Sequence, residues 1–100
     1  MAEEYSEFVR FELPLFSTED LRELEQLTRD LYKGLAQTSK TTDTVYTHAR
    51  WSAIRAELLI RDCNLKDVAT DELHSLKQTM PDDIQLHEAI ELVLLRRGIV

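Results

Sequence analysis

The chain has 100 residues, a formal net charge of −7, 43% hydrophobic residues and 31% charged residues. These fractions are typical of a globular protein and exclude a disordered chain. With Gly 2 and Pro 2, the sequence is also short of the turn residues that an all-β fold needs. It therefore predicts one domain over residues 1–100, built from long helices with few connections.

The charge is distributed unevenly along the chain. Residues 1–30 carry −6, residues 31–66 carry +3, and residues 67–100 carry −4. An acidic chain binds nucleic acid poorly in general, because phosphate affinity comes largely from released counterions. Only the middle segment could offer a basic face, and the acidic end segments suit a basic protein partner.

Three features of the sequence predict a cytoplasmic protein that does not enter a membrane. The first residues show no basic segment followed by an apolar one, so no secretion signal is expected. No apolar run approaches the roughly 20 residues that cross a bilayer. The single cysteine, Cys63, cannot form an intramolecular disulfide, as is usual in a reducing compartment.

Residues 7–15 alternate in a way that predicts an N-terminal β-strand. One face would carry Val9, Phe11, Leu13 and Leu15, and Pro14 would place the strand at an edge or end it. An isolated strand leaves its backbone groups unpaired, so we expect a partner strand. That partner is either residues 42–47 or the same strand of a second subunit. The second option favours a homodimer, in which both apolar faces are buried.

The first predicted helix covers about 18–35. Ser17 or Thr18 can cap it, and acidic residues follow in its first turn. An apolar stripe of helical spacing then predicts the buried face: Leu21, Leu24, Leu27, Leu31 and Leu35.

The second predicted helix covers 48–62, and residues 44–47 either form a short strand or open this helix. Trp51, Ile54 and Leu58 share one face, and further apolar residues widen it, which is typical of a helix central to a small bundle. Asn64 is suited to the C-cap.

Two further helices are predicted. One lies near 66–79, either continuous or broken at residues 69–70. The last begins at Pro81, and Arg96, Arg97 and Gly98 mark its end. The expected fold class is therefore mostly α (α+β): one N-terminal strand followed by about four helices in a small bundle, with the strand paired across a dimer in one alternative.

No motif for catalysis, cofactor binding or metal binding can be written. Two glycines exclude a dinucleotide fingerprint and a phosphate loop, and there is no CxxC, HExxH or Ca²⁺ loop. His87 and Glu91 share a helical face, but a metal site would need more ligands. The thiol of Cys63 is expected to be a buried small hydrophobe. The weaker alternative is a small enzyme using Cys63 with His48 or His74. We expect no enzyme activity, cofactor or metal.

The second helix offers the candidate partner-binding residues. Arg50 and Arg61 return to nearly the same azimuth, since eleven residues at about 100° complete three turns. Trp51 and Arg55 lie along the same helix, and Arg10 adds a further basic group. These residues could bind an acidic partner or a phosphate backbone. In the alternative, Trp51 fills the core and the arginines pair with acids of the first helix.

The order of a strand, Phe8–Leu13, followed by the first helix and residues 51–61, resembles in layout the ribbon-helix-helix family of DNA-binding proteins. The resemblance covers residues 8–62 and implies a dimeric transcriptional regulator that uses Arg10, Arg50, Arg55 and Arg61. The long connection between the helices departs from that family.

The main hypothesis is a non-enzymatic protein-protein interaction module, a small adaptor, inhibitor or regulatory subunit, with an acidic surface.

Overall fold

The computed structural model describes residues 2–38 and 41–98. These residues form five α-helices: α1 (Ala2–Glu7), α2 (Thr18–Thr38), α3 (Thr41–Asp62), α4 (Thr70–Thr79) and α5 (Ile84–Arg96). A π-helical turn, η1 (Phe8–Glu12), and a 3-10 turn, η2 (Leu13–Leu15), continue α1, and a second 3-10 turn, η3 (Leu65–Asp67), follows α3. The mostly helical fold class is confirmed.

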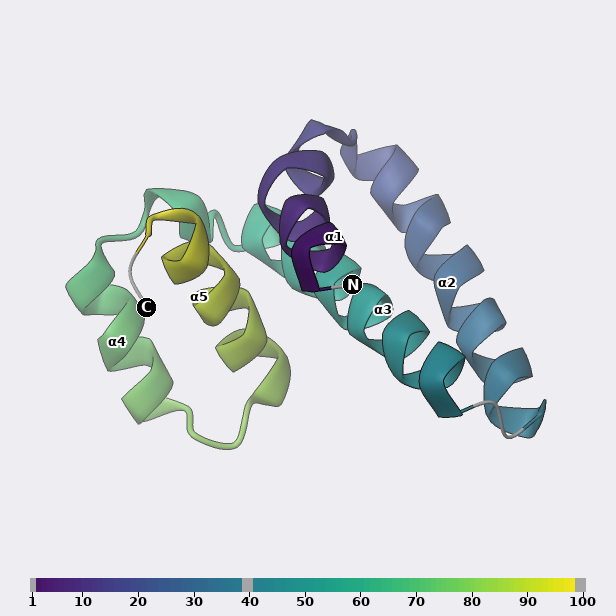
Figure 1. The fold of residues 1–100 in the computed structure, drawn as a ribbon. Coiled ribbons are helices and arrows are strands. Elements are labelled where there is room, and N and C mark those ends of the chain that lie inside the picture. The colour runs from purple at the N-terminus through teal and green to yellow at the C-terminus, as the bar shows by residue number, and fades with distance from the viewer. Residues whose placement is uncertain (1, 39–40, 99–100) are drawn as a thin grey trace.

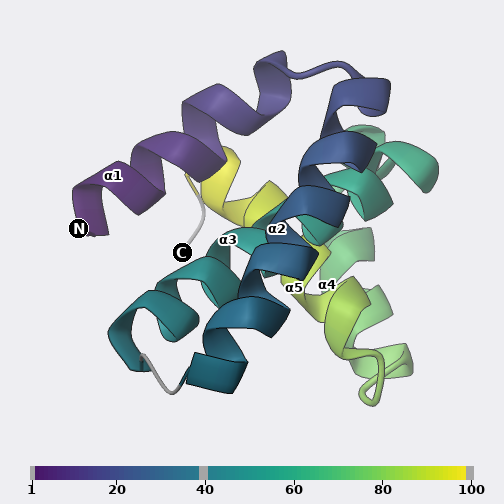
Figure 2. The same ribbon diagram turned by 90° about the vertical axis from the view of Figure 1, so that its right-hand side faces the viewer.

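Helix α3 lies at the centre of the fold. It packs against α2 on one side and α5 on the other, and α4 packs on α5 (Figure 1). The N-terminal segment α1–η1–η2 runs alongside α3, from Tyr5 at Ala49 to Leu13 at Arg61, and touches α5 through η1 (Figure 2). Five fully buried side chains come from five different elements and hold them to one core: Leu13, Leu21, Ile54, Leu73 and Ile90.

Helix α2 confirms the first predicted helix and extends it to Thr38. Ser17 is its cap, because the Ser17 hydroxyl accepts from the Asp20 amide at 3.1 Å. The predicted buried stripe is only partly correct. Leu21 is buried, whereas Leu27 and Leu31 are 67% and 57% exposed.

Helix α3 begins at Thr41, so residues 44–47 open the helix and do not form a strand. It ends at Asp62, and Asn64 takes the left-handed conformation, with φ 54, that ends many helices. Cys63 is exposed, which corrects the predicted buried thiol. The reason is that Cys63 follows the last helical residue, while the apolar face of the helix closes at Ile60, which is 3% exposed.

Of the two alternatives for residues 66–79, the broken one is correct: η3 ends at Asp67, Val68 and Ala69 are extended, and α4 begins at Thr70. Helix α5 starts later than predicted. Pro81 lies in the preceding turn, and Asp83 caps the helix by accepting from the Leu86 amide at 3.0 Å. Gly98, with φ 79, follows the end of the helix.

The predicted N-terminal strand is wrong: residues 7–15 are helical, and no strand occurs within residues 2–38 and 41–98. Alternation every two residues is present, but a helical spacing coexists with it. Phe8, Val9 and Leu13 are buried, whereas Phe11 and Leu15 are 64% and 84% exposed. Burial at i, i+1 and i+5 fits one face of a helix, so tertiary packing selects that period.

Pro14 accounts for the irregular helix that replaces the strand. Its ring would clash with the carbonyl four residues earlier and interrupt an α-helical ladder. Here the Leu13 amide donates to the Phe8 carbonyl, five residues back, and a 3-10 turn follows. The backbone of this segment is therefore paired within the chain. The unpaired strand that motivated the predicted homodimer does not exist.

Candidate functional site

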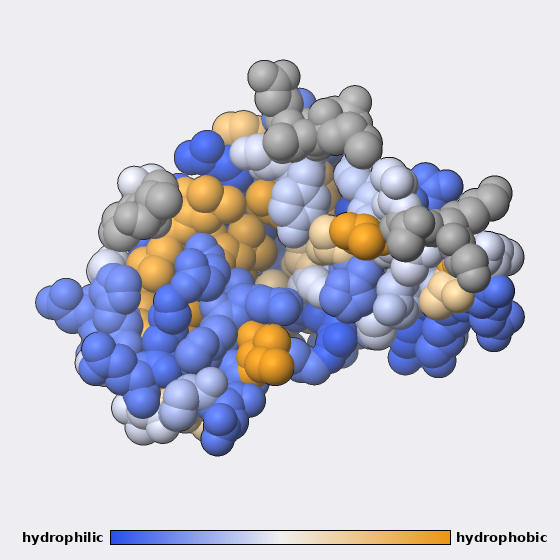
Figure 3. Space-filling view, turned by 60° about the horizontal axis from the view of Figure 1, so that its bottom comes forward, coloured by the Kyte–Doolittle hydropathy of each residue, from blue (hydrophilic) through white to orange (hydrophobic). Residues whose placement is uncertain are grey.

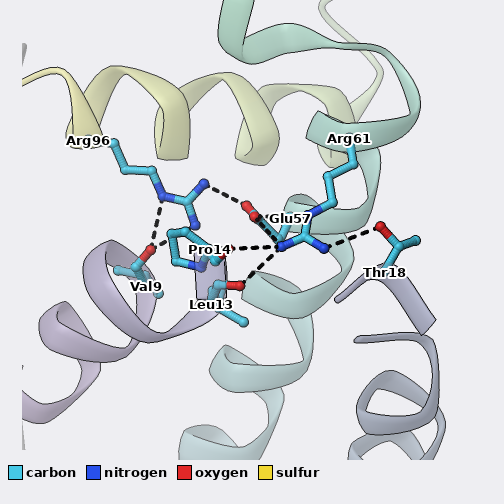
Figure 4. Close-up of polar contacts among 7 residues, drawn as sticks. All are labelled: Val9, Leu13, Pro14, Thr18, Glu57, Arg61 and Arg96. Carbon is cyan, nitrogen blue, oxygen red and sulfur yellow. Dashed lines mark hydrogen bonds and ion pairs between the residues drawn. The ribbon is translucent and has the colours of Figure 1, made fainter. Parts of the chain in front are cut away.

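A buried ionic cluster joins the N-terminal segment to α3 and α5. Glu57 of α3 is 3% exposed, and its carboxylate binds Arg61 of the same helix and Arg96 of α5. The Arg61 Nη2–Glu57 Oε1 distance is 3.2 Å, and the Arg96 Nη1–Glu57 Oε2 distance is 2.5 Å. We call Glu57, Arg61 and Arg96 the Glu57 cluster (Figure 4).

The arginines of the Glu57 cluster also cap backbone carbonyls that the irregular segment leaves open. Because the Leu13 amide donates to Phe8, the Val9 carbonyl loses the donor that an α-helix would give it. Arg96 supplies two donors instead, Nε at 3.0 Å and Nη2 at 2.8 Å. Arg61 donates to the Leu13 carbonyl at 3.3 Å and to the Pro14 carbonyl at 3.4 Å (Figure 4).

Arg61 also contacts a third residue of this part of the chain, Thr18. Its Nη1 donates to the hydroxyl of Thr18, the first residue of α2, at 3.2 Å. A buried carboxylate shared by two guanidinium groups is stable only when its hydrogen-bonding capacity is well satisfied. The geometry is that of a structural clamp, which fixes residues 9–18 on α3 and α5.

The structure separates the five predicted partner-binding residues. Arg61 belongs to the Glu57 cluster, and Arg50 lies with its guanidinium carbon 4.4 Å from the ring centroid of Phe8. The shared azimuth of Arg50 and Arg61 is thus present, and both contact the N-terminal segment. Arg10 is exposed on η1.

Trp51 and Arg55 lie together on another part of α3. The guanidinium carbon of Arg55 is 5.0 Å from the Trp51 ring centroid. The ring centroid of Tyr32, in α2, lies 5.5 Å from the Trp51 ring centroid, and the two rings are tilted relative to each other. Trp51 is half-buried, and its indole nitrogen is buried with no hydrogen-bond partner among residues 2–38 and 41–98. Trp51 therefore contributes to the α2–α3 contact.

A groove of about 650 Å³ opens between α1, α3 and α5. This volume is within the range of roughly 300–1,000 Å³ that is common for binding sites. Small side chains of α3 line one side at helical spacing: Ala49, Ser52, Ala53 and Ala56. Leu92 and Leu95 of α5 face them, and Tyr5 lies at the α1 end. On the face shown in Figure 3, apolar patches are interrupted by hydrophilic side chains.

The rim of this groove is acidic. Glu88 and Glu91 of α5 line it, and both are exposed. Glu91 pairs with Lys77 of α4, whereas Glu88 has no ion-pair partner among the described residues. Among the described residues, no lysine or arginine lines the groove, and the other titratable residues that line it are Tyr5, His48 and His87.

Tyr5 joins α1 to the floor of the groove. Its hydroxyl donates to the Ala49 carbonyl at 3.4 Å. Burial raises the pKa of the Tyr5 phenol, and the negative charge of Glu88 raises it further. The phenol therefore stays protonated, and can donate, over the whole neutral range.

Sequence reasoning missed the groove and the Glu57 cluster. The signal for the cluster was Glu57, the one acid in the apolar part of the second helix, where an ion needs partners. The signal for the groove was the run of small residues at positions 49, 52, 53 and 56 on one helical face. His87 and Glu91 do not act together: a His87 ring nitrogen lies 2.9 Å from the Met80 carbonyl oxygen.

The described part of the chain contains no group of three or more histidine, cysteine or acidic residues placed to hold a metal ion. Its helices are also not long and apolar enough to cross a membrane. The chain matches no family model, no curated protein and no solved structure. Function is therefore inferred from the groove and the charges around it.

Proposed function

We propose that this chain is a non-enzymatic protein-protein interaction module, a small adaptor, inhibitor or regulatory subunit, that binds a basic protein surface. The observation that carries the proposal is the groove between α1, α3 and α5, which combines an apolar floor with an acidic rim. Concave apolar surfaces with a few polar groups at the edge are typical binding sites.

Two further features support binding to a basic partner. The net charge of −7 gives long-range attraction, which speeds encounter with a basic protein. Large apolar side chains are also exposed outside the groove, including Phe11 and Leu15 on the N-terminal segment and Leu27 and Leu31 on α2. Exposed apolar groups of this size add contact area in a complex.

The alternative of a ribbon-helix-helix DNA-binding regulator has no observation in its favour. That family's ribbon would have to be formed by the predicted N-terminal strand, but these residues are helical. Arg61, one of the predicted DNA-binding arginines, pairs with Glu57 in the Glu57 cluster. A salt titration against duplex DNA separates the two functions, and we expect no binding even at low salt.

The experiment that tests the proposed function is affinity capture with the immobilised full chain in extract from cells that express it. We expect one or a few basic proteins to be retained, displaced by excess soluble chain, and released as salt rises through physiological strength. A matched bait, the same chain unfolded by urea and coupled in the same amount, controls for charge alone. Retention of the same proteins by both baits, or of none by the folded one, contradicts the proposal.

A further inference from the structure

The α3 wall of the groove has a shape that suits a helix. Ala49, Ser52, Ala53 and Ala56 lie at i, i+3, i+4 and i+7, so they form one continuous face of α3. Ala49 and Ser52 are the half-buried, accessible part of this face, whereas Ala53 and Ala56, each 5% exposed, are almost covered within the chain. Side chains this small let another backbone approach closely. The face runs over eight residues, 49–56, with a rise of about 10 Å or two helical turns.

The facing wall is of a different kind. Leu92 and Leu95 of α5 are longer apolar side chains, and Ile84, at the start of the same helix, is 71% exposed. An amphipathic helix bound between these walls would bury an apolar stripe about two turns long. Helices that bind in the grooves of other proteins have apolar anchors at i, i+3, i+4 and i+7, which also span two turns.

The negative charge at the rim favours a bound segment that carries positive charge. Glu88 is exposed, and in the part of the chain that the structure describes it has no ion pair and no lysine or arginine lines the groove to neutralise it. A lysine or arginine on the flank of a bound helix would pair with this carboxylate. An acidic segment would be repelled, which also disfavours a second copy of this chain with its net charge of −7.

We propose that the groove between α1, α3 and α5 binds a cationic amphipathic helix of a partner protein, with its apolar stripe on the small-residue face of α3 and a basic side chain on Glu88. The proposal rests on the proposed function and deepens it by naming the class of partner and its place of binding.

The test uses a fluorescein-labelled peptide of leucine and lysine, about 14 residues long and capped at both ends, with leucines at helical spacing. Fluorescence polarisation measures its binding to the full chain at low salt. Ser52→Trp places an indole in the groove, and Glu88→Lys reverses the rim charge. Glu12→Lys makes the same change in net charge at an exposed residue of η1 that is not among those lining the groove, and is the matched control.

We expect Ser52→Trp to weaken binding by at least about tenfold, and Glu88→Lys by about three- to tenfold, as for loss of an exposed ion pair and its replacement by repulsion. Glu12→Lys should change affinity by less than about twofold. Circular dichroism checks folding, and Glu88→Lys, at an exposed position, still decides if Ser52→Trp does not fold.

Three results of the peptide assay would overturn the proposal. Equal effects of Glu88→Lys and Glu12→Lys would show binding through net charge alone. Unchanged binding by folded Ser52→Trp would place the peptide elsewhere, and equal binding of the glutamate version of the peptide would remove the charge argument. Failure of the groove is distinguishable from failure of the proposed function. A native partner retained equally by wild-type and Ser52→Trp baits leaves the function standing and refutes the groove.

Discussion

Replacing Glu57 with glutamine tests the role of the Glu57 cluster in holding the N-terminal segment. Glutamine keeps the shape of the side chain but removes the negative charge. Its amide also turns two donors toward guanidinium groups that are donors only. Arg61 and Arg96 would keep their contacts to the carbonyls of Val9, Leu13 and Pro14 but lose their shared counter-ion.

The magnitude follows from the burial of the three partners. Removing one member of a buried ion pair costs about 3–5 kcal/mol. The side chains of Arg61 and Arg96 remain 23% and 20% exposed, so water offsets part of that cost. We expect Glu57→Gln to lower the free energy of unfolding by about 2–4 kcal/mol, a large part of the roughly 5–15 kcal/mol that a domain has.

The assay is equilibrium unfolding in urea followed by circular dichroism, with the slope against urea checked for constancy. Thermal unfolding should show a midpoint lower by about 10–25 °C, since 1 kcal/mol corresponds to about 4–8 °C in a domain of this size. Glu91→Gln, which breaks the exposed pair with Lys77, is the matched control and should cost less than about 1 kcal/mol. Equal losses in the two variants would refute the clamp.

Three further predictions concern the core, the groove and the helix ends. Leu13→Ala should destabilise the chain by about 2–5 kcal/mol, because Leu13 is fully buried, whereas Leu15→Ala, at an 84% exposed residue, should change stability by less than about 0.5 kcal/mol; similar urea midpoints would contradict the burial of this segment. Tyr5 has a raised pKa, so the unfolded chain ionises first and stability falls as pH rises through the ordinary value of 10.0; Tyr5→Phe should show less of this alkaline loss, and parallel pH profiles of the urea midpoint would count against the buried phenol. Asp83→Ala should lower stability by about 0.5–2 kcal/mol through loss of the cap, while Asp82→Ala, in the preceding turn, serves as its control; equal midpoints for the two would show that Asp83 does not cap α5.

The sequence predicts the helices well where periodicity and end signals agree. Helix α2 has an apolar stripe, a serine cap and acids in its first turn, and its predicted start at Thr18 is confirmed. The end of α3 near Asn64 and the end of α5 near Gly98 are also confirmed, because a left-handed residue is a local requirement that a short sequence can reveal.

The N-terminal segment shows where local patterns fail. Residues 7–15 satisfy both a period of two and a helical period, and the choice depends on Arg96 and Arg61, which lie 87 and 48 residues away from the carbonyls that they cap. The Glu57 cluster and the groove have the same origin. Each is assembled from elements distant in sequence. Composition and spacing can therefore indicate the residues that belong to it, but they do not predict that these residues contact one another.

We propose that the groove between α1, α3 and α5 is the binding surface of this chain. The most direct measurement is nuclear magnetic resonance mapping of backbone amides while the cationic leucine-lysine peptide is added to the full chain. We predict that the amides whose signals shift most belong to residues 49–56 of α3 and 84–95 of α5, and that they return to their free positions as salt displaces the peptide. Shifts concentrated on α2, or spread evenly over the acidic surface, would contradict the claim.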